Sequence, residues 1–323
     1  MKIAQLAKAV LAFSAACLAS TYAHAQAYPA KGLRIVVPFL PGGGGDIMAR
    51  TIAPVMAEGL GQSITVENRA GAGTLIGSEH ALKNPADGYT LLVTYPSFVI
   101  SPVLHSTTRF DPLRDFKAIG QTVAITMAFV VHPSLPVKTL RDLVTLARNR
   151  PGEIAYGAGA GTGHYLLGEM LRLSNNIKII PIPYQGSPQM LPAIIGGHIS
   201  MALTNVVEGA PFVASGKLRP LAVTTATRDG TWPGVPTVRE SGFPDLEAAA
   251  WGGFVVRTGT AQGVITRLNH ELVRAVQSPA VSGKLKSQSM VPTPGSAEQF
   301  GALIQSEYAR YAKVIREVGI KVE

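Results

Sequence analysis

The sequence predicts an α/β protein of two lobes joined by two crossing strands. Strand-like and helix-like runs alternate along the chain, which is typical of a mostly parallel sheet covered by helices. Two apolar segments, Ala124–Val131 and Trp251–Val256, flank the middle of the chain, and no glycine-rich helix start follows either directly. We interpret them as hinge strands that carry the chain out of one lobe and back. Residues 26–126 and 250–323 then form the first lobe, and residues 127–249 the second.

Local patterns predict the individual elements. Apolar residues recur at helical spacing from Ile47 to Leu60, the turn pair Asp87-Gly88 introduces a buried strand, and Thr139 caps a helix. The other expected strands are Arg34–Phe39, Ser63–Glu67, Tyr89–Thr94, Ile154–Tyr156, Ile177–Pro181, Ile199–Leu203 and Pro220–Thr224. The expected helices are Asp46–Leu60, one ending near Asn84, Thr139–Arg148, His164–Leu173, Pro188–Gly196, Gly209–Ser215, Ala261–Val276 and Ala297–Glu317.

The first 25 residues resemble a secretory signal peptide. A short basic start precedes the apolar run Ala9–Ala19, and Ala23-His-Ala25 fits a cleavage site. A run of about 11 apolar residues is too short to cross a bilayer, which needs about 20. We therefore expect export and cleavage after Ala25.

Cys17, the only cysteine, lies within this leader. Lipidation of Cys17 is the less favoured alternative, because the apolar run before it would be very short. After cleavage the chain would contain no disulfide, no thiolate nucleophile and no cysteine metal site.

The charge balance argues against a nucleic-acid partner. Without Lys2 and Lys8 the chain has 27 basic and 20 acidic residues, a net charge of +7, and the basic residues are scattered. Nucleic-acid binding requires a concentrated basic face. The composition instead indicates an exported protein with a mild attraction for anions.

The motifs of catalysis are missing from the sequence. It has no G-x-S-x-G elbow, and no two of the mature histidines lie four residues apart. Those histidines are His80, His105, His132, His164, His198 and His270. We therefore expect no enzyme, no cofactor and no metal, with a hydrolase as the remote alternative.

Two glycine-rich turns are the best candidates for a binding site. Pro41-Gly-Gly-Gly-Gly-Asp46 and Gly157-Ala-Gly-Ala-Gly-Thr-Gly163 each follow an expected strand and open an expected helix. The unpaired amides and positive dipole of a helix start favour an anion, and glycine allows its close approach. Neither turn matches a nucleotide-binding motif, which predicts a smaller anion such as a carboxylate.

Particular groups within these turns are the expected donors. In the first turn we expect the amides of Gly43, Gly44 and Gly45 to serve the ligand and Asp46 to cap the helix. In the second we expect the amides of Gly161, Thr162 and Gly163, together with the Thr162 hydroxyl. Ser97, Thr204 and Asn205 follow or end strands at the carboxyl edge, where ligands of open α/β sheets bind.

These residues resemble the Bug family of solute-binding proteins, which serve tripartite tricarboxylate transporters. The resemblance covers nearly all of the mature chain in order. It is carried by Tyr28-Pro29, Ile35–Phe39, Pro41–Asp46, Val66–Arg69, Gly71–Gly73, Asp87–Tyr89, Pro181–Tyr184, Gly216–Arg219, Ala222–Thr224 and Val235–Thr237. It implies a periplasmic Venus-flytrap protein of type II, in which the two turns grip ligand carboxylates, often through water. Carried over, the gripping segments are Gly42 to Asp46 and Ala158 to Gly163.

Three positions depart from the family pattern. Thr204 stands where an aspartate is common, Ala158 where a serine is common, and Ser101 where an asparagine is frequent. A cleft without the acid at position 204 has one partner fewer for a ligand ammonium. This departure predicts a ligand with carboxylates and no amine.

The combined prediction is a monomeric carrier that captures a small organic acid and delivers it to the membrane subunits of a tripartite tricarboxylate-type transporter. The alternative is a periplasmic sensor module that presents the loaded protein to a signalling receptor.

Overall fold

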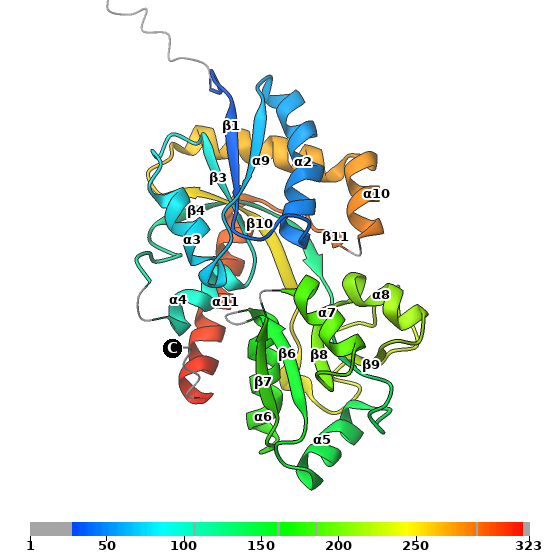
Figure 1. The fold of residues 1–323 in the computed structure, drawn as a ribbon. Coiled ribbons are helices and arrows are strands. Elements are labelled where there is room, and N and C mark those ends of the chain that lie inside the picture. The colour runs from blue at the N-terminus through cyan, green and yellow to red at the C-terminus, as the bar shows by residue number, and fades with distance from the viewer. Residues whose placement is uncertain (1–27, 106–107, 160–161, 185, 289, 319–323) are drawn as a thin grey trace, which may run out of the picture.

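The computed structural model describes residues 28–105, 108–159, 162–184, 186–288 and 290–318. The described strands form two sheets, one in each of the two lobes seen in Figure 1. The six-stranded sheet has the order β11-β4-β10-β3-β1-β2, and the five-stranded sheet has the order β7-β6-β8-β5-β9. The strands are β1 (Leu33–Val37), β2 (Ile64–Asn68), β3 (Thr90–Thr94), β4 (Phe116–Ile125), β5 (Met127–Val131), β6 (Ala155–Gly159), β7 (Ile180–Tyr184), β8 (Met201–Asn205), β9 (Arg219–Val223), β10 (Ala250–Arg257) and β11 (Met290–Pro292).

Helices cover both sheets, as the alternating pattern predicts. They are α2 (Gly44–Leu60), α3 (Leu75–Leu82), α4 (Ser97–Leu104), α5 (Leu140–Asn149), α6 (Gly163–Ser174), α7 (Ser187–Ile195), α8 (Val206–Ala214), α9 (Gln262–Gln277), α10 (Pro279–Ser287) and α11 (Ala297–Val318), with short 3-10 turns at Ala72–Thr74 and Pro244–Leu246. Among the described residues, no helix is both long and apolar enough to cross a membrane.

The first sheet brings the first glycine turn to its carboxyl edge. β1 lies between β2 and β3 and runs parallel to both. Successive β1 side chains are buried on opposite faces, because Ile35 joins the cluster containing α2 and α9 while Val36 joins the cluster containing α4 and α11. Burial on both faces fixes the register of β1. Because β1 and β3 run parallel, the loops that follow them lie at the same edge of the sheet.

The second sheet repeats this arrangement in the other lobe. β6 lies parallel to β7 and β8, while β5 runs antiparallel to β8 and β9. The carboxyl ends of β6 and β8 therefore lie at one edge, and α6 and α8 begin just beyond them.

The chain crosses between the lobes within the predicted segment Ala124–Val131 and, on its return, just before the other predicted segment, Trp251–Val256. β4 ends in the first sheet at Ile125, and after Thr126 the chain continues as β5 of the second sheet. On the return path, the amide of Ala248 still donates to Thr224 O in the second lobe, and β10 begins at Ala250 in the first sheet. The return crossing therefore precedes β10, and the strand itself does not span the hinge.

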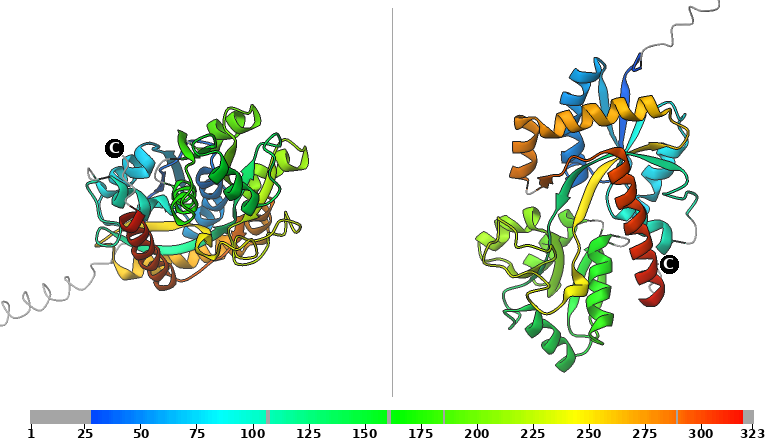
Figure 2. Two further views of the ribbon diagram at one scale, coloured as in Figure 1. Left: turned by 90° about the horizontal axis from the view of Figure 1, so that it is seen from below. Right: turned by 180° about the vertical axis from the view of Figure 1, so that it is seen from behind.

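The last helix adds a further contact between the lobes. Figure 2 shows α11 running from the first lobe alongside α6 of the second, and the two helices are in contact. Leu166 of α6 shares a buried cluster with Phe300 and Ile304 of α11. This apolar contact lies beside the hinge.

Some elements were not expected from the sequence. α4 contains Pro102 within its span, and β4 extends back to Phe116 through exposed Lys117 and partly buried Gln121. α10 and β11 follow α9 closely, and Ser278 caps α10 by accepting from the Val281 amide at 3.4 Å. The predicted signal peptide lies outside the described residues.

Candidate functional site

The first glycine turn leaves two helix-start amides without a partner. α2 begins at Gly44, and Gly43 is its extended N-cap residue. The Gly43 amide donates to Leu40 O at 3.2 Å. Among the described residues, the amides of Gly44 and Gly45 have no hydrogen-bond acceptor. The expected donor set of this turn therefore narrows to Gly44 and Gly45.

Asp46 does not cap the helix, which corrects the sequence prediction. It occupies the third helical position, where its carboxylate reaches back to the Gly42 amide at 3.0 Å. The same buried carboxylate accepts from Arg50 Nε and Asn68 Nδ2, each at 2.9 Å. Four successive glycines let the helix start two residues earlier than expected, with Gly42 at a φ of +79°.

The charge of Asp46 serves the loop. Burial would raise the pKa of this carboxyl, but bonds from the Gly42 amide, Arg50 and Asn68 to its charged form hold the pKa below its usual value. Both oxygens of the Asp46 carboxylate therefore already accept hydrogen bonds, and these bonds hold the turn in its conformation.

The second turn also presents a helix start. Thr162 caps α6 by accepting from the Tyr165 amide at 3.3 Å, and its hydroxyl donates to Gly159 O at 2.6 Å. The Thr162 hydroxyl is thus already used as a donor in this structure. The amides of Gly163 and His164 have no acceptor among the described residues. Gly161, a predicted site residue, lies outside the described residues.

The segment Tyr95-Pro96 connects the two turns in space. A Cβ atom added at Gly44 would lie 3.9 Å from Tyr95 Oη, and one added at Gly163 would lie 3.8 Å from Pro96 Cβ. The starts of α2 and α6, which belong to different lobes, therefore both face this segment. We call the α2 start, Gly43–Gly45, the first jaw and the α6 start, Thr162–His164, the second jaw.

The remaining predicted site residues lie around these jaws. Ser97 begins α4 directly after Tyr95-Pro96, and its Oγ is buried without a partner among the described residues. Asn205 Oδ1 lies 3.1 Å from His164 Nε2, which ties the end of β8 to the second jaw. Thr204 and Ala158 are buried within β8 and β6, with exposures of 0% and 1%.

Four further polar residues were not identified from the sequence: Tyr95 and Glu208 beside the jaws, and Thr74 and Ser78 on the segment that packs against α4. The hydroxyls of Thr74 and Ser78, on the α3 segment that contacts α4, are buried without partners among the described residues. Glu208 lies in the first turn of α8 and accepts a bond from Ser187 Oγ at 2.6 Å. In the sequence, the only indication of a role for Glu208 is that it is an acidic residue four positions after Thr204.

Burial and the Glu208 charge set the protonation states of His164 in the second jaw and of Tyr95 beside the first. Burial lowers the pKa of His164, although the Glu208 charge and the Asn205 bond oppose this shift. Burial also raises the pKa of Tyr95, and the Glu208 charge raises it further. His164 is therefore neutral and Tyr95 protonated near pH 7. Among the described residues, no three His, Cys, Asp or Glu side chains gather closely enough to hold a metal ion.

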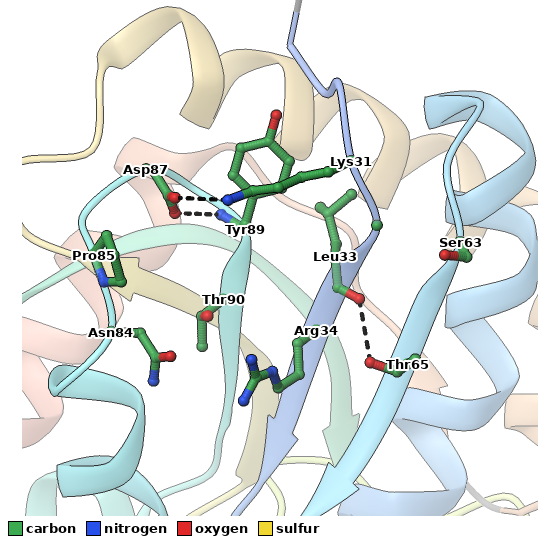
Figure 3. A pocket seen from close by; sticks show the side chains of 11 residues that line it. Lys31, Leu33, Arg34, Ser63, Thr65, Asn84, Pro85, Asp87, Tyr89 and Thr90 are labelled. Atoms are coloured by element: carbon green, nitrogen blue, oxygen red, sulfur yellow. Dashed lines mark hydrogen bonds and ion pairs between the residues drawn. The ribbon is translucent and has the colours of Figure 1, made fainter.

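A separate surface hollow lies at the opposite edge of the first sheet. Figure 3 shows its lining residues at the amino ends of β1, β2 and β3. The hollow has a volume of about 350 Å³. Its charges pair locally, since Lys31 lies 3.5 Å from Asp87 and Arg34 lies 3.3 Å from Glu67. Because these charges are paired and the jaws lie at the other edge, the hollow forms no part of the candidate site.

Comparison with known proteins identifies the family of the chain. Residues 48–320 match the tripartite tricarboxylate transporter family receptor. The chain belongs to this receptor family. This result confirms the family resemblance and periplasmic-receptor character seen in the sequence.

Individual proteins similar to this chain match nearly its whole length. Protein BugT of Bordetella pertussis is 34% identical over 93% of each chain. R. palustris Rpa4515, solved with adipate, is 33% identical with a TM-score of 0.84, covering 91% of this chain and 99% of its own. MatC from Rhodopseudomonas palustris, solved with bound malate, is 26% identical with a TM-score of 0.82, covering 89% and 100%. The two-lobe periplasmic binding protein fold is thereby confirmed.

Proposed function

We propose that this protein captures a small organic carboxylate between its two lobes and delivers it to the membrane subunits of a tripartite tricarboxylate-type transporter. The observation that carries the proposal is the pair of jaws, whose unpaired amides from two lobes face the same segment. Helix-start amides bind anions, and ligand held by both lobes favours the closed arrangement through its higher affinity for it.

Two further observations support a carboxylate. Among the described residues, the hydroxyls of Ser97, Thr74 and Ser78 are buried without a hydrogen-bond partner, which makes them further candidate donors to a carboxylate. Adipate and malate, found with Rpa4515 and MatC, are both dicarboxylates. One carboxylate per jaw is the simplest way for a dicarboxylate to bind.

The proposal includes a non-catalytic, monomeric carrier without a cofactor, cleaved after Ala25. Residues 26–126 with 250–323, and residues 127–249, are its proposed lobes. Light scattering tests whether the protein is a monomer, and N-terminal sequencing of the periplasmic protein tests whether cleavage follows Ala25. Incubation with the ligand tests for catalysis, and we expect the ligand to be recovered unchanged.

A thermal-shift screen over mono-, di- and tricarboxylates, aromatic acids and amino acids tests the function. A ligand at about 100 times its Kd adds roughly 2.7 kcal/mol to the free energy of unfolding. We expect at least one carboxylate to raise Tm by several degrees and neutral analogues such as the diamide to leave it unchanged. Equal shifts with acid and diamide would contradict carboxylate recognition.

A further inference from the structure

The side chain of Glu208 does not bond to the start of its own helix, α8. It is the third residue of α8, where an acidic side chain commonly reaches back to the N-cap amide. Its Oε2 instead accepts from Ser187 Oγ of α7 at 2.6 Å and lies 3.5 Å from Thr204 Oγ1. The carboxylate is thus turned toward the end of β8, beside the second jaw.

Within the part of the chain that the structure describes, no positive side chain forms an ion pair with this carboxylate. Among the described residues, no lysine, arginine or histidine lies within ion-pair distance of Glu208. By contrast, the buried carboxylates Asp46, Glu169 and Glu271 each pair with an arginine. Among the described residues, the Glu208 charge acts on two other ionisable groups, His164 of the second lobe and Tyr95 of the first, and raises the pKa of each. Neither carries a positive charge near pH 7.

This unpaired charge affects which anions can bind between the jaws. A ligand that carries only carboxylates would bring more negative charge to a part-buried carboxylate, and the two charges repel. A ligand with an ammonium group would supply the missing cation. Charge-assisted hydrogen bonds of this kind are stronger than bonds from a neutral hydroxyl.

We propose that Glu208 accepts a hydrogen bond from an ammonium group of the ligand, so that the preferred ligand is an amino-acid carboxylate. This inference rests on the proposed function. Thr204, considered alone, predicts a ligand without an amine. Glu208 supplies an acid four residues later, with its Oε2 3.5 Å from Thr204 Oγ1, and so provides the acidic partner that Thr204 cannot. The Ser187 bond holds the carboxylate in place before the ligand arrives.

The test compares ligands that differ at one carbon. Calorimetry at pH 7 on the mature chain, residues 26–323, measures Kd for succinate, L-malate and L-aspartate, which carry hydrogen, hydroxyl and ammonium at the same position. Glutarate with L-glutamate, and adipate with L-2-aminoadipate, extend the comparison to longer ligands. We expect the amino member to bind at least tenfold more tightly than its unsubstituted partner for the preferred length. Tightest binding by the unsubstituted or hydroxy acid at that length would overturn the inference.

Variants identify the residue responsible. Glu208→Gln keeps the size of the side chain and an oxygen for the Ser187 bond but removes the charge. We expect this variant to lower the affinity for the amino ligand at least tenfold, while the unsubstituted diacid binds as before or more tightly. The matched control is Glu153→Gln, which removes an exposed acid of the same lobe and leaves all affinities unchanged. Retention of the amino preference by Glu208→Gln would also overturn the inference.

The two proposals fail in different ways. If no carboxylate or amino acid binds the wild-type chain, the proposed function itself fails. If diacids bind tightly and an added amino group lowers their affinity, the proposed function stands and the role of Glu208 is refuted. The wild-type ligand series needs no variant, so it decides the matter even if Glu208→Gln does not fold.

Discussion

Proline substitutions can delete one amide from each jaw without breaking either helix. Gly44 and Gly163 are the first helical residues of α2 and α6, the position where proline is favoured because the amide has no helical acceptor. The preceding residues have ψ of 164° in both cases, the extended conformation that proline imposes on its predecessor. Gly44→Pro and Gly163→Pro therefore remove a proposed ligand donor and little else.

The size of the effect follows from the bond that is lost. A hydrogen bond to a charged group contributes about 1.5–3 kcal/mol. Since about 1.4 kcal/mol is tenfold in affinity, each variant should weaken carboxylate binding roughly 10- to 150-fold. The free energy of unfolding should be unchanged or rise by about 0.4–1 kcal/mol, because proline restricts the unfolded chain at a compatible site.

Alanine at the same positions provides the control. Gly44→Ala and Gly163→Ala keep the amide and add a Cβ with ordinary contacts, the nearest being 3.4 Å from Met290 Cε and 3.8 Å from Pro96 Cβ. Calorimetry should show near-native affinity for both alanine variants and weak binding for both proline variants. Equal affinities for proline and alanine at each position would refute the reasoning that these amides hold the ligand.

Three further outcomes concern stability. Asp46→Asn replaces one acceptor oxygen with a donor and should lower the free energy of unfolding in urea by about 1–3 kcal/mol, since the Gly42 amide or a side-chain donor then lacks its bond. Thr139→Ala removes half of the α5 capping box and should cost about 0.5–2 kcal/mol, with Thr139→Ser as the near-neutral control. Because folding lowers the pKa of Asp46, Glu67 and Glu271, their contribution is present above their unfolded pKa near 4. It is lost as pH falls through the lower folded values, so urea midpoints should decline from about pH 4 downward; a rising midpoint there would contradict this assignment.

Local patterns were sufficient for most of the fold. The alternation of strands and helices predicted both sheets, and Thr139 was correctly identified as the cap of α5. The crossing near Thr126 was also predicted, because a long apolar run without a helix start indicates a chain that continues extended. The weaker elements α4 and α10 were missed because prolines and small residues dilute their helical periodicity.

The candidate site was predictable only where its residues are close in sequence. The glycine turns carry their own signal. The role of Asp46 depends on Asn68, which is distant in sequence, so local rules assigned it to the cap. Glu208 and Tyr95 come from different lobes, and only folding brings the Glu208 charge close to the Tyr95 hydroxyl. Long-range placement of this kind has no signature in one sequence.

A crystal structure with a bound carboxylate tests the central claim most directly, since that claim is that jaws from two lobes hold one ligand. The carboxylate that binds most tightly in calorimetry is the ligand to use. We predict carboxylate oxygens within about 3.2 Å of amides in both jaws, Gly44 or Gly45 in the first and Gly163 or His164 in the second, directly or through one water. A ligand held by one lobe alone, or in the hollow beside Lys31 and Asp87, would contradict the account.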